Sequence, residues 1–482
     1  MKGTYFILVV LLSAAVSGNG FAQRGAGAYA SYTDNIAALE RELASAPRQR
    51  RGDIYARLAS EHYNAAELYN EISFASAATG NLYYAVMDEN NWDAGDVASL
   101  FRGIGYHEMG KLAEAISTLE SFVGSSGRID TRAETTARAW LGIAYYTSGQ
   151  TERAVEQWRR IESEERDQCG ILAFAYAKVG YRIETAGQWC GDGSAVGNDR
   201  ASIIPALQVA TVREQYEQVS AMLGGYRVTP SHIENRGMET ETRFYDPAAI
   251  RTVSNAHYLL AYRYASHAVE SGANEANKDL YRSAFYFYTG QFGKVIETQV
   301  GRDDVYGALY LAAAYYAAGE PDVAQDVFRY IERSNDHDVL SKLGLLYARL
   351  GVAGKERQAV EYAEQAVRDS RDRSGRMIRQ DRYRRLGEIY VLQGEYDRAI
   401  EVLSSAFRSE RRDDLRANDP QYLIMYGTSI VLGKNFIALS EAIDMFSTVM
   451  RAYPVATGLV ETTSLLDVAT NIGREGRIIY RR

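Results

Sequence analysis

Cysteine and histidine are scarce in this chain of 482 residues. Two cysteines cannot build a disulfide scaffold or a four-cysteine zinc site, and six scattered histidines leave little material for a metal centre. The net charge of -8 gives no electrostatic reason to expect nucleic acid as the main partner. With 46% apolar residues the chain is too hydrophobic to be disordered, so we expect a buried core.

Motifs for catalysis are missing as well. The sequence has no strong strand pattern, no G-x-S-x-G motif and no phosphate-binding loop. His107-Glu108 lies in a helical stretch, but Lys111 stands where a zinc protease needs its second histidine. The glycine-rich stretch 191–197 is one residue off the dinucleotide-binding spacing and follows no strand, so it indicates a turn. We therefore expect no cofactor, no metal and no enzymatic activity.

Residues 1–22 have the pattern of a secretory signal peptide. Lys2 supplies the positive start, Tyr5–Val16 is an apolar run too short to span a membrane, and Gly20–Ala22 is a small-x-small cleavage site. The first cysteine is Cys169, so no cysteine near the cleavage site can carry a lipid. We expect a mature chain that is periplasmic or secreted and not stably inserted in the membrane. An uncleaved anchor is the alternative.

One pattern recurs six times along the chain. A small residue, preceded by leucine in five copies, is followed after three residues by tyrosine and then by a turn glycine; most copies then carry an alanine and a large apolar residue. The small residues are Gly103, Gly142, Ala173, Ala312, Gly344 and Gly387, and the turn glycines are Gly110, Gly149, Gly180, Gly319, Gly351 and Gly394. Because each copy has two stripes of apolar residues at helical spacing, each predicts two antiparallel helices.

The small residue in the first helix of each copy must have a compensating packing role. Glycine inside a helix costs roughly 1 kcal/mol relative to alanine. Close approach of the second helix supplies the compensation, and we expect the alanine of that helix, such as Ala399 in the copy of Gly387, to lie opposite. Large residues, such as Leu403, then fill the space on either side.

These copies resemble the tetratricopeptide repeat, a 34-residue unit with W-x2-L-G-x2-Y, then A-x3-F and a late proline. The match covers about 96–190 and 305–455, where the last unit has Ala442, Phe446 and Pro454 at the family offsets. The leading tryptophan is absent from most copies. The resemblance implies an all-α fold, a right-handed α-solenoid of antiparallel helix pairs. Because Phe21-Ala22-Gln23 resembles the end of bacterial signal peptides, we expect an exported bacterial member of this family. Residues 30–90 and 247–300 match poorly, and we interpret them as degenerate units.

Turn residues interrupt the helical pattern between Gly224 and Pro247. We therefore predict a signal peptide at 1–22, N-terminal repeats at 23–223, an irregular connecting loop at 224–247, and C-terminal repeats with a capping helix at 248–482. The loop is interpreted as a mobile insertion. A contact of its own is the alternative.

The resemblance also places a partner-binding groove on the first helix of each unit. The positions it implies are Leu100, Ile104, His107, Ala139, Ile143, Tyr146, Leu309, Ala313, Tyr316, Arg384, Glu388 and Val391. Most of these side chains are apolar or aromatic, so the family's lysine and asparagine clamp for a carboxylate is not expected. Packing against neighbouring units is an equal alternative for every one of them.

A concave solenoid surface binds extended peptides or helices, so we expect a non-catalytic protein-protein interaction scaffold of the cell envelope. One alternative is a module that binds glycan or peptidoglycan, since many of the 36 tyrosines could stack on sugar rings. A cell-wall lytic enzyme is a further alternative. It would need a separate globular part, and 224–247 is too short to be one.

Two further features of the sequence have a structural and a functional interpretation. Cys169 and Cys190 fall at the same end of one predicted helix pair, which favours a disulfide worth about 3 kcal/mol in an oxidising compartment. Two unpaired core thiols are the alternative. The segment 368–385 carries eight arginines, which predicts either an anion-binding patch or a solvated helix face and loop.

The expected interlock of small residues gives a direct test. Ala399→Leu should lower the free energy of unfolding by about 1–3 kcal/mol, because the added methyl groups overpack the contact between the two helices. Thermal or urea denaturation of the variant measures the change. An unchanged melting curve would show that the register of the repeat is wrong.

Overall fold

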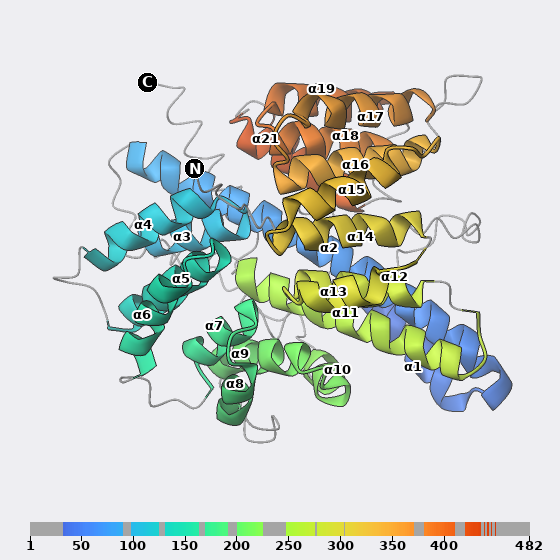
Figure 1. Ribbon diagram of the computed structural model, residues 1–482, viewed down its shortest axis with the longest axis horizontal. Coiled ribbons are helices and arrows are strands. Elements are labelled where there is room, and N and C mark those ends of the chain that lie inside the picture. Colours follow the sequence, from blue (N-terminus) through green and yellow to red (C-terminus); the bar gives the residue numbers. More distant parts are fainter. Residues whose placement is uncertain are drawn as a thin grey trace.

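The computed structural model describes residues 32–89, 98–124, 131–162, 169–190, 200–224, 247–274, 277–302, 304–370, 380–409 and 420–434, with 438, 441, 442, 445 and 449. All regular secondary structure in these ranges is helical. The expected all-α fold is confirmed (Figure 1). The predicted signal peptide, the stretch 191–197, residues 225–246 of the connecting loop, Phe446 and Pro454 lie outside the described residues.

The helices follow one another with short connections. Their bounds are α1 Tyr32–Ser45, α2 Arg48–Glu89, α3 Ala98–Glu108, α4 Leu112–Gly124, α5 Thr131–Thr147, α6 Thr151–Glu162, α7 Ile171–Val179, α8 Ile183–Cys190, α9 Arg200–Val212, α10 Tyr216–Gly224, α11 Pro247–Glu270, α12 Lys278–Tyr288, α13 Phe292–Gln299, α14 Val305–Ala317, α15 Pro321–Ile331, α16 His337–Leu350, α17 Glu356–Arg368, α18 Gln380–Leu392, α19 Tyr396–Ser409 and α21 Pro420–Leu432. The last unit continues beyond α21 at Ala442, which is buried.

The turn glycines have the backbone that the repeat pattern requires. All six lie between the two helices of a unit at positive φ, between 57° at Gly351 and 85° at Gly319, where side chains with a Cβ are disfavoured. Glu214 occupies the same place between α9 and α10 at a φ of 57°. The six predicted helix pairs are therefore confirmed, and α9–α10 and α12–α13 extend the array.

The close approach inside each pair differs in detail from the expected interlock. A Cβ on Gly142 would lie 2.2 Å from Trp158 Nε1, and one on Gly387 would lie 2.7 Å from Leu403. The small residue thus makes room for the large side chain of the second helix. Only at Gly344 does the alanine lie opposite, because a Cβ there would meet the carbonyl oxygen of Ala359 at 2.6 Å.

The expectation of degenerate units is wrong for two long stretches. Residues 48–89 form one uninterrupted helix, α2, and residues 247–270 form another, α11. No turn glycine lies between Gly52 and Gly80, so nothing in this part of α2 reverses the chain. The two helices run antiparallel: the Ser73 hydroxyl donates to the carbonyl of Pro247, and that of Ser254 donates to Ala66.

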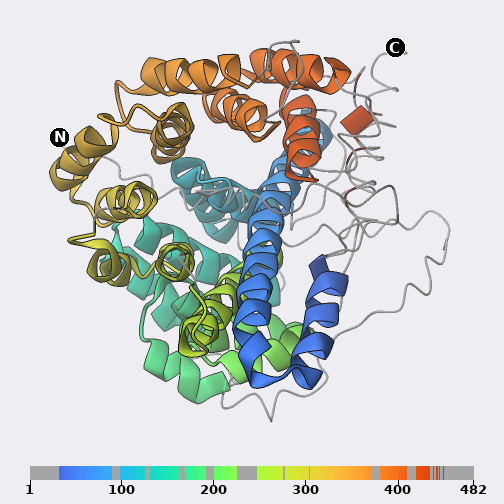
Figure 2. The ribbon, with the colours of Figure 1, turned by 90° about the vertical axis from the view of Figure 1, so that its right-hand side faces the viewer.

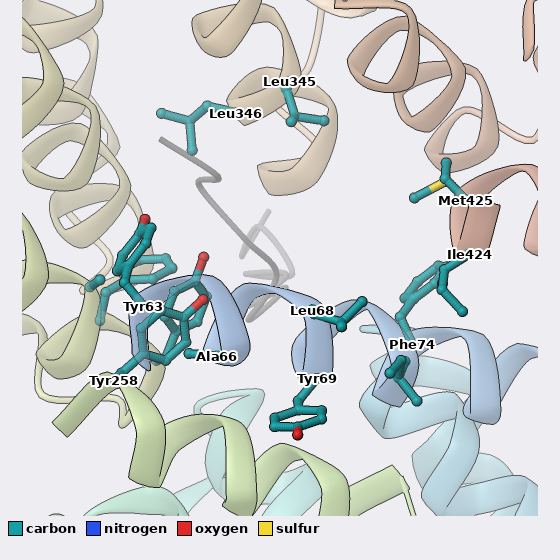
Figure 3. Packing of buried hydrophobic residues seen from close by; sticks show 14 of the residues in the cluster. Tyr63, Ala66, Leu68, Tyr69, Phe74, Tyr258, Leu345, Leu346, Ile424 and Met425 are labelled. Atoms are coloured by element: carbon teal, nitrogen blue, oxygen red, sulfur yellow. The ribbon is translucent and has the colours of Figure 1, made fainter. Parts of the chain in front are cut away.

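Helix α2 lies inside the curve of the repeats. Figure 2 shows it on the concave side of the arc that runs from α12 to α21. The largest core cluster joins α2 and α11 to the inner faces of α14, α16, α18 and α21. Figure 3 shows members of this cluster from α2, α11, α16 and α21, among them Tyr63, Leu68, Tyr69, Phe74, Tyr258, Leu345, Leu346, Ile424 and Met425. A second cluster holds α3–α8 together, with residues of α9 and α11.

Candidate functional site

The inner wall of the arc is the candidate interaction site. Nine of the twelve predicted groove residues are buried: Leu100, Ile104, Ala139, Ile143, Leu309, Ala313, Arg384, Glu388 and Val391. Only His107, Tyr146 and Tyr316 are half-buried. The structure therefore brings most of these positions into internal contacts.

Two kinds of apolar contact cover seven of the nine buried residues, and Arg384 and Glu388 form buried ion pairs. Leu100, Ile104, Ala139 and Ile143 belong to the cluster formed by neighbouring N-terminal units. Leu309, Ala313 and Val391 pack in the cluster that contains α2. For these seven residues the structure shows internal packing, the alternative given for every groove position, because adjacent repeats or α2 cover them.

A set of buried charges, here called the polar seam, joins α2 to α16 and α18. It consists of Glu67 and Glu71 of α2, Arg349 of α16, and Arg384 and Glu388 of α18. The Arg384 guanidinium donates to the Glu71 carboxylate, and Arg349 Nε donates to Glu388 Oε1 at 2.8 Å. Each side chain of these two pairs is at most 3% exposed, so breaking either pair would leave a charge without compensation.

Glu67 is the exceptional carboxyl of the polar seam. Burial raises its pKa to about 7, although the hydrogen bond from Tyr258 and the charges of Arg349 and Arg384 oppose the shift. The Tyr258 hydroxyl donates to Glu67 Oε1 at 2.6 Å. With Glu67 protonated, the seam has two carboxylates and two guanidiniums, and its charge is balanced.

Two histidines pack between α2 and α11 next to this seam. The Nδ1 atoms of His62 and His257 lie 2.8 Å apart, and both rings are buried. Burial lowers the pKa of His257 to about 4, and burial together with His257 lowers the pKa of His62 well below its usual value. Both rings are therefore neutral near pH 7 and share one N–H hydrogen bond.

The α18 part of the arginine-rich segment is internal, whereas Arg368 at the end of α17 is exposed. Arg384 and Arg385 are 2% and 1% exposed, and Arg385 donates to Asp338 and Asp381. Arg385 and Lys342 hold the pKa of Asp338 well below its usual range, against the effect of burial. These arginines fasten α18 to α16 and α2, so neither an anion patch nor a solvated face describes them. Residues 371–379 lie outside the described ranges.

The half-buried groove tyrosine of α5 belongs to a cluster of aromatic rings. The ring of Tyr146 lies 5.8 Å from those of Trp158 and Tyr181, and Trp189 follows at 5.5 Å from Tyr176. Tyr146, Tyr181 and Trp189 keep part of their surface exposed. Trp189 directly precedes Cys190, whose sulfur is bonded to that of Cys169 with the two Cα atoms 4.5 Å apart.

Sequence reasoning missed the polar residues of α2. His62, Glu67 and Glu71 fall in the stretch interpreted as a degenerate unit. The usable signal was the absence of a turn glycine across this stretch, which indicates one long helix. Among the residues that the structure describes, no group of three or more His, Cys, Asp or Glu side chains is arranged to hold a metal ion. None of the described helices is both long and apolar enough to cross a membrane.

Comparison with known proteins supports the repeat assignment over one segment. The model of the tetratricopeptide repeat family matches residues 135–160, which lie on α5 and α6. Among curated proteins none matches this chain.

Two solved structures align over most of the chain, with low similarity. The crystal structure of the APC/C hetero-tetramer Cut9-Hcn1 is 12% identical, with a TM-score of 0.28, and the alignment covers 92% of this chain and 86% of that one. The structure of yeast Tom70 is 13% identical, with a TM-score of 0.31 and 93% of each chain covered.

Glu67 gives the fold a specific pH dependence. Since its folded-state pKa lies above the unfolded value, folding favours its protonated form, and stability is lost as the pH rises from about 4.5 through 7. Glu67→Gln removes this effect. Between pH 5 and pH 8 the variant should therefore gain about 2–3 kcal/mol of unfolding free energy relative to the wild type, measured by urea denaturation.

Protonation of the pair His62 and His257 changes the unfolding free energy in the opposite direction as the pH falls, but this change is the same in the wild type and in Glu67→Gln. Glu361→Gln is the matched control, because the Glu361 side chain is 54% exposed and should show no such gain. If the unfolding free energies of the wild type and Glu67→Gln change with pH in parallel, the raised pKa of Glu67 is contradicted.

Proposed function

We propose that this chain is a non-catalytic interaction scaffold of the cell envelope, which binds a protein partner as an extended peptide or helix along its inner wall. The observation that carries the proposal is that the wall holds a helix, α2, through apolar contacts and through the polar seam. A surface of this chemistry suits helical ligands. The tetratricopeptide repeat match at 135–160 supports the same kind of function.

The partner contacts the part of the wall that α2 and the neighbouring repeats leave accessible. Among the predicted groove residues these are Tyr146 and Tyr316, whereas the His107 side chain is only 10% exposed and lies against Glu108. Tyrosine presents a large, stiff apolar surface together with a hydroxyl, and it is enriched where proteins bind each other.

Affinity capture tests this proposal. The tagged mature chain is recovered from its native envelope and the bound proteins are identified by mass spectrometry. Tyr146→Ala combined with Tyr316→Ala should reduce the captured partner at least tenfold, because a tyrosine at an interface centre commonly contributes 2 kcal/mol or more.

Tyr330→Ala is the matched control, since Tyr330 is 40% exposed on α15, the other helix of the unit that carries Tyr316. It should leave capture unchanged. Capture that is equally strong with the double variant, at unchanged melting temperature, would show that the inner wall is not the binding surface.

The alternative is a glycan-binding module, which the aromatic cluster favours. Tyr146, Tyr181 and Trp189 are half-buried members of one aromatic cluster, and exposed aromatic rings can stack on sugars. Retention of the chain on purified insoluble cell wall, lost in Trp189→Ala, would support this function. A protein-binding scaffold is expected to wash off.

The proposed location is the periplasm or the cell exterior. The signal pattern at 1–22 supports it, and so does the bond between Cys169 and Cys190, because disulfides persist in oxidising compartments. Protein isolated from the envelope without reductant and then denatured should not react with a maleimide at either cysteine, whereas Cys190→Ser should react at one. Labelling of both thiols in the unreduced wild type would contradict this location.

A further inference from the structure

A compact group of charges lies buried where α3, α7 and α11 meet, apart from the polar seam. The carboxylate of Glu108 lies 2.8 Å from Lys178 Nζ, 3.2 Å from His107 Nδ1 and 3.5 Å from Arg251 Nε. The exposed side-chain fractions are 3% for Glu108 and 4% for Arg251, against 13% for Lys178 and 10% for His107. A lysine and an arginine thus share one carboxylate that is almost entirely buried.

The charges of this group do not balance. Burial alone would raise the pKa of Glu108, but Lys178, His107 and Arg251 hold it well below its usual range, so the carboxylate is ionised. Burial lowers the pKa of His107, which is therefore neutral near pH 7. Among the residues that the structure describes here, one negative charge then faces two positive ones, which leaves an excess of one positive charge.

The excess charge coincides with unused hydrogen-bond donors. Neither Nη1 nor Nη2 of Arg251 has a hydrogen-bond partner among the atoms of the structure, although both are buried. His107 Nε2 is also without one. A buried guanidinium whose amino groups are unpaired loses the hydration of those groups without compensation, which costs more for a charged group than for a neutral one.

We propose that this corner binds a small monovalent inorganic anion, of the size and charge of chloride, through Nη1 and Nη2 of Arg251 and the positive charge of Lys178. One such ion neutralises the excess charge and accepts hydrogen bonds from the guanidinium. Because Arg251 is only 3% exposed, the side chain of a macromolecular partner cannot reach it. The partly exposed edge formed by Lys178 and His107 is the side from which an ion enters.

The ion joins two parts of the fold. Glu108 ends α3, Lys178 lies in the last turn of α7, and Arg251 is in the first turns of α11. Helices α3 and α7 belong to the N-terminal repeats, whereas α11 pairs with α2. An anion held by Arg251 and Lys178 therefore stabilises the junction between the N-terminal repeats and the α2–α11 pair.

A chloride titration of residues 23–482, the chain without the predicted signal peptide, tests the proposal. Chloride replaces gluconate at constant ionic strength, and the melting temperature is followed. The wild type should show a rise that saturates with chloride concentration, because an ion that binds only the folded state stabilises it in this way. Arg251→Met should abolish the saturable rise. Lys178→Met should move its midpoint about tenfold higher, as expected for one lost charge interaction.

Arg357→Met is the matched control, because the Arg357 side chain is 92% exposed and its loss should leave the chloride response unchanged. A wild type without a saturable response, or an equal response in Arg251→Met, would overturn the proposal. If Arg251→Met does not fold, Lys178→Met decides in the same way. Crystals grown in bromide give an independent readout, since an anomalous peak is expected within hydrogen-bond distance of Arg251. If Arg251 is well ordered in the electron density and no such peak appears, the result counts against the site.

Discussion

The packing of α2 against α11 and the inner face of the repeats is the contact on which the rest of the structure depends. In an ordinary helical solenoid each unit contacts only its neighbours, and stability is a sum of local terms. Here α2 contacts α1, α3, α11 and α21, and its side chains reach α14, α16 and α18. The repeats therefore curve around a helix, and the part of their inner wall that α2 covers belongs to the core.

The charges inside this core are arranged so that few are left uncompensated. Arg349 and Arg384 face Glu388 and Glu71, while burial keeps Glu67 protonated over the acidic range. Buried ion pairs contribute little net stability compared with well-packed apolar residues, but each partner is costly to remove alone. The polar seam thus fixes how α2 is seated in the wall, because a shift along its axis would separate several charges at once.

Local patterns made the repeats predictable. The small residue, the turn glycine and the large residue of the second helix all fall within about twenty residues. Gly142, Gly149 and Trp158 therefore predict a helix pair from local sequence alone. What covers the inner face could not be deduced in this way. The family offsets place Arg384 and Glu388 on that face, but their neighbours Glu71 and Arg349 come from distant parts of the chain, and no spacing in the sequence encodes that pairing.

The path of α2 has a consequence for how the chain is made. Residues 48–89 leave the ribosome early, whereas α21, which covers one part of this helix, ends only at Leu432. Until then the growing chain carries a long helix whose apolar side chains are not yet covered by all of the repeats. Such a state favours association with chaperones or with other chains. Folding must close loops of several hundred residues, which makes it slow compared with solenoids built from nearest-neighbour contacts.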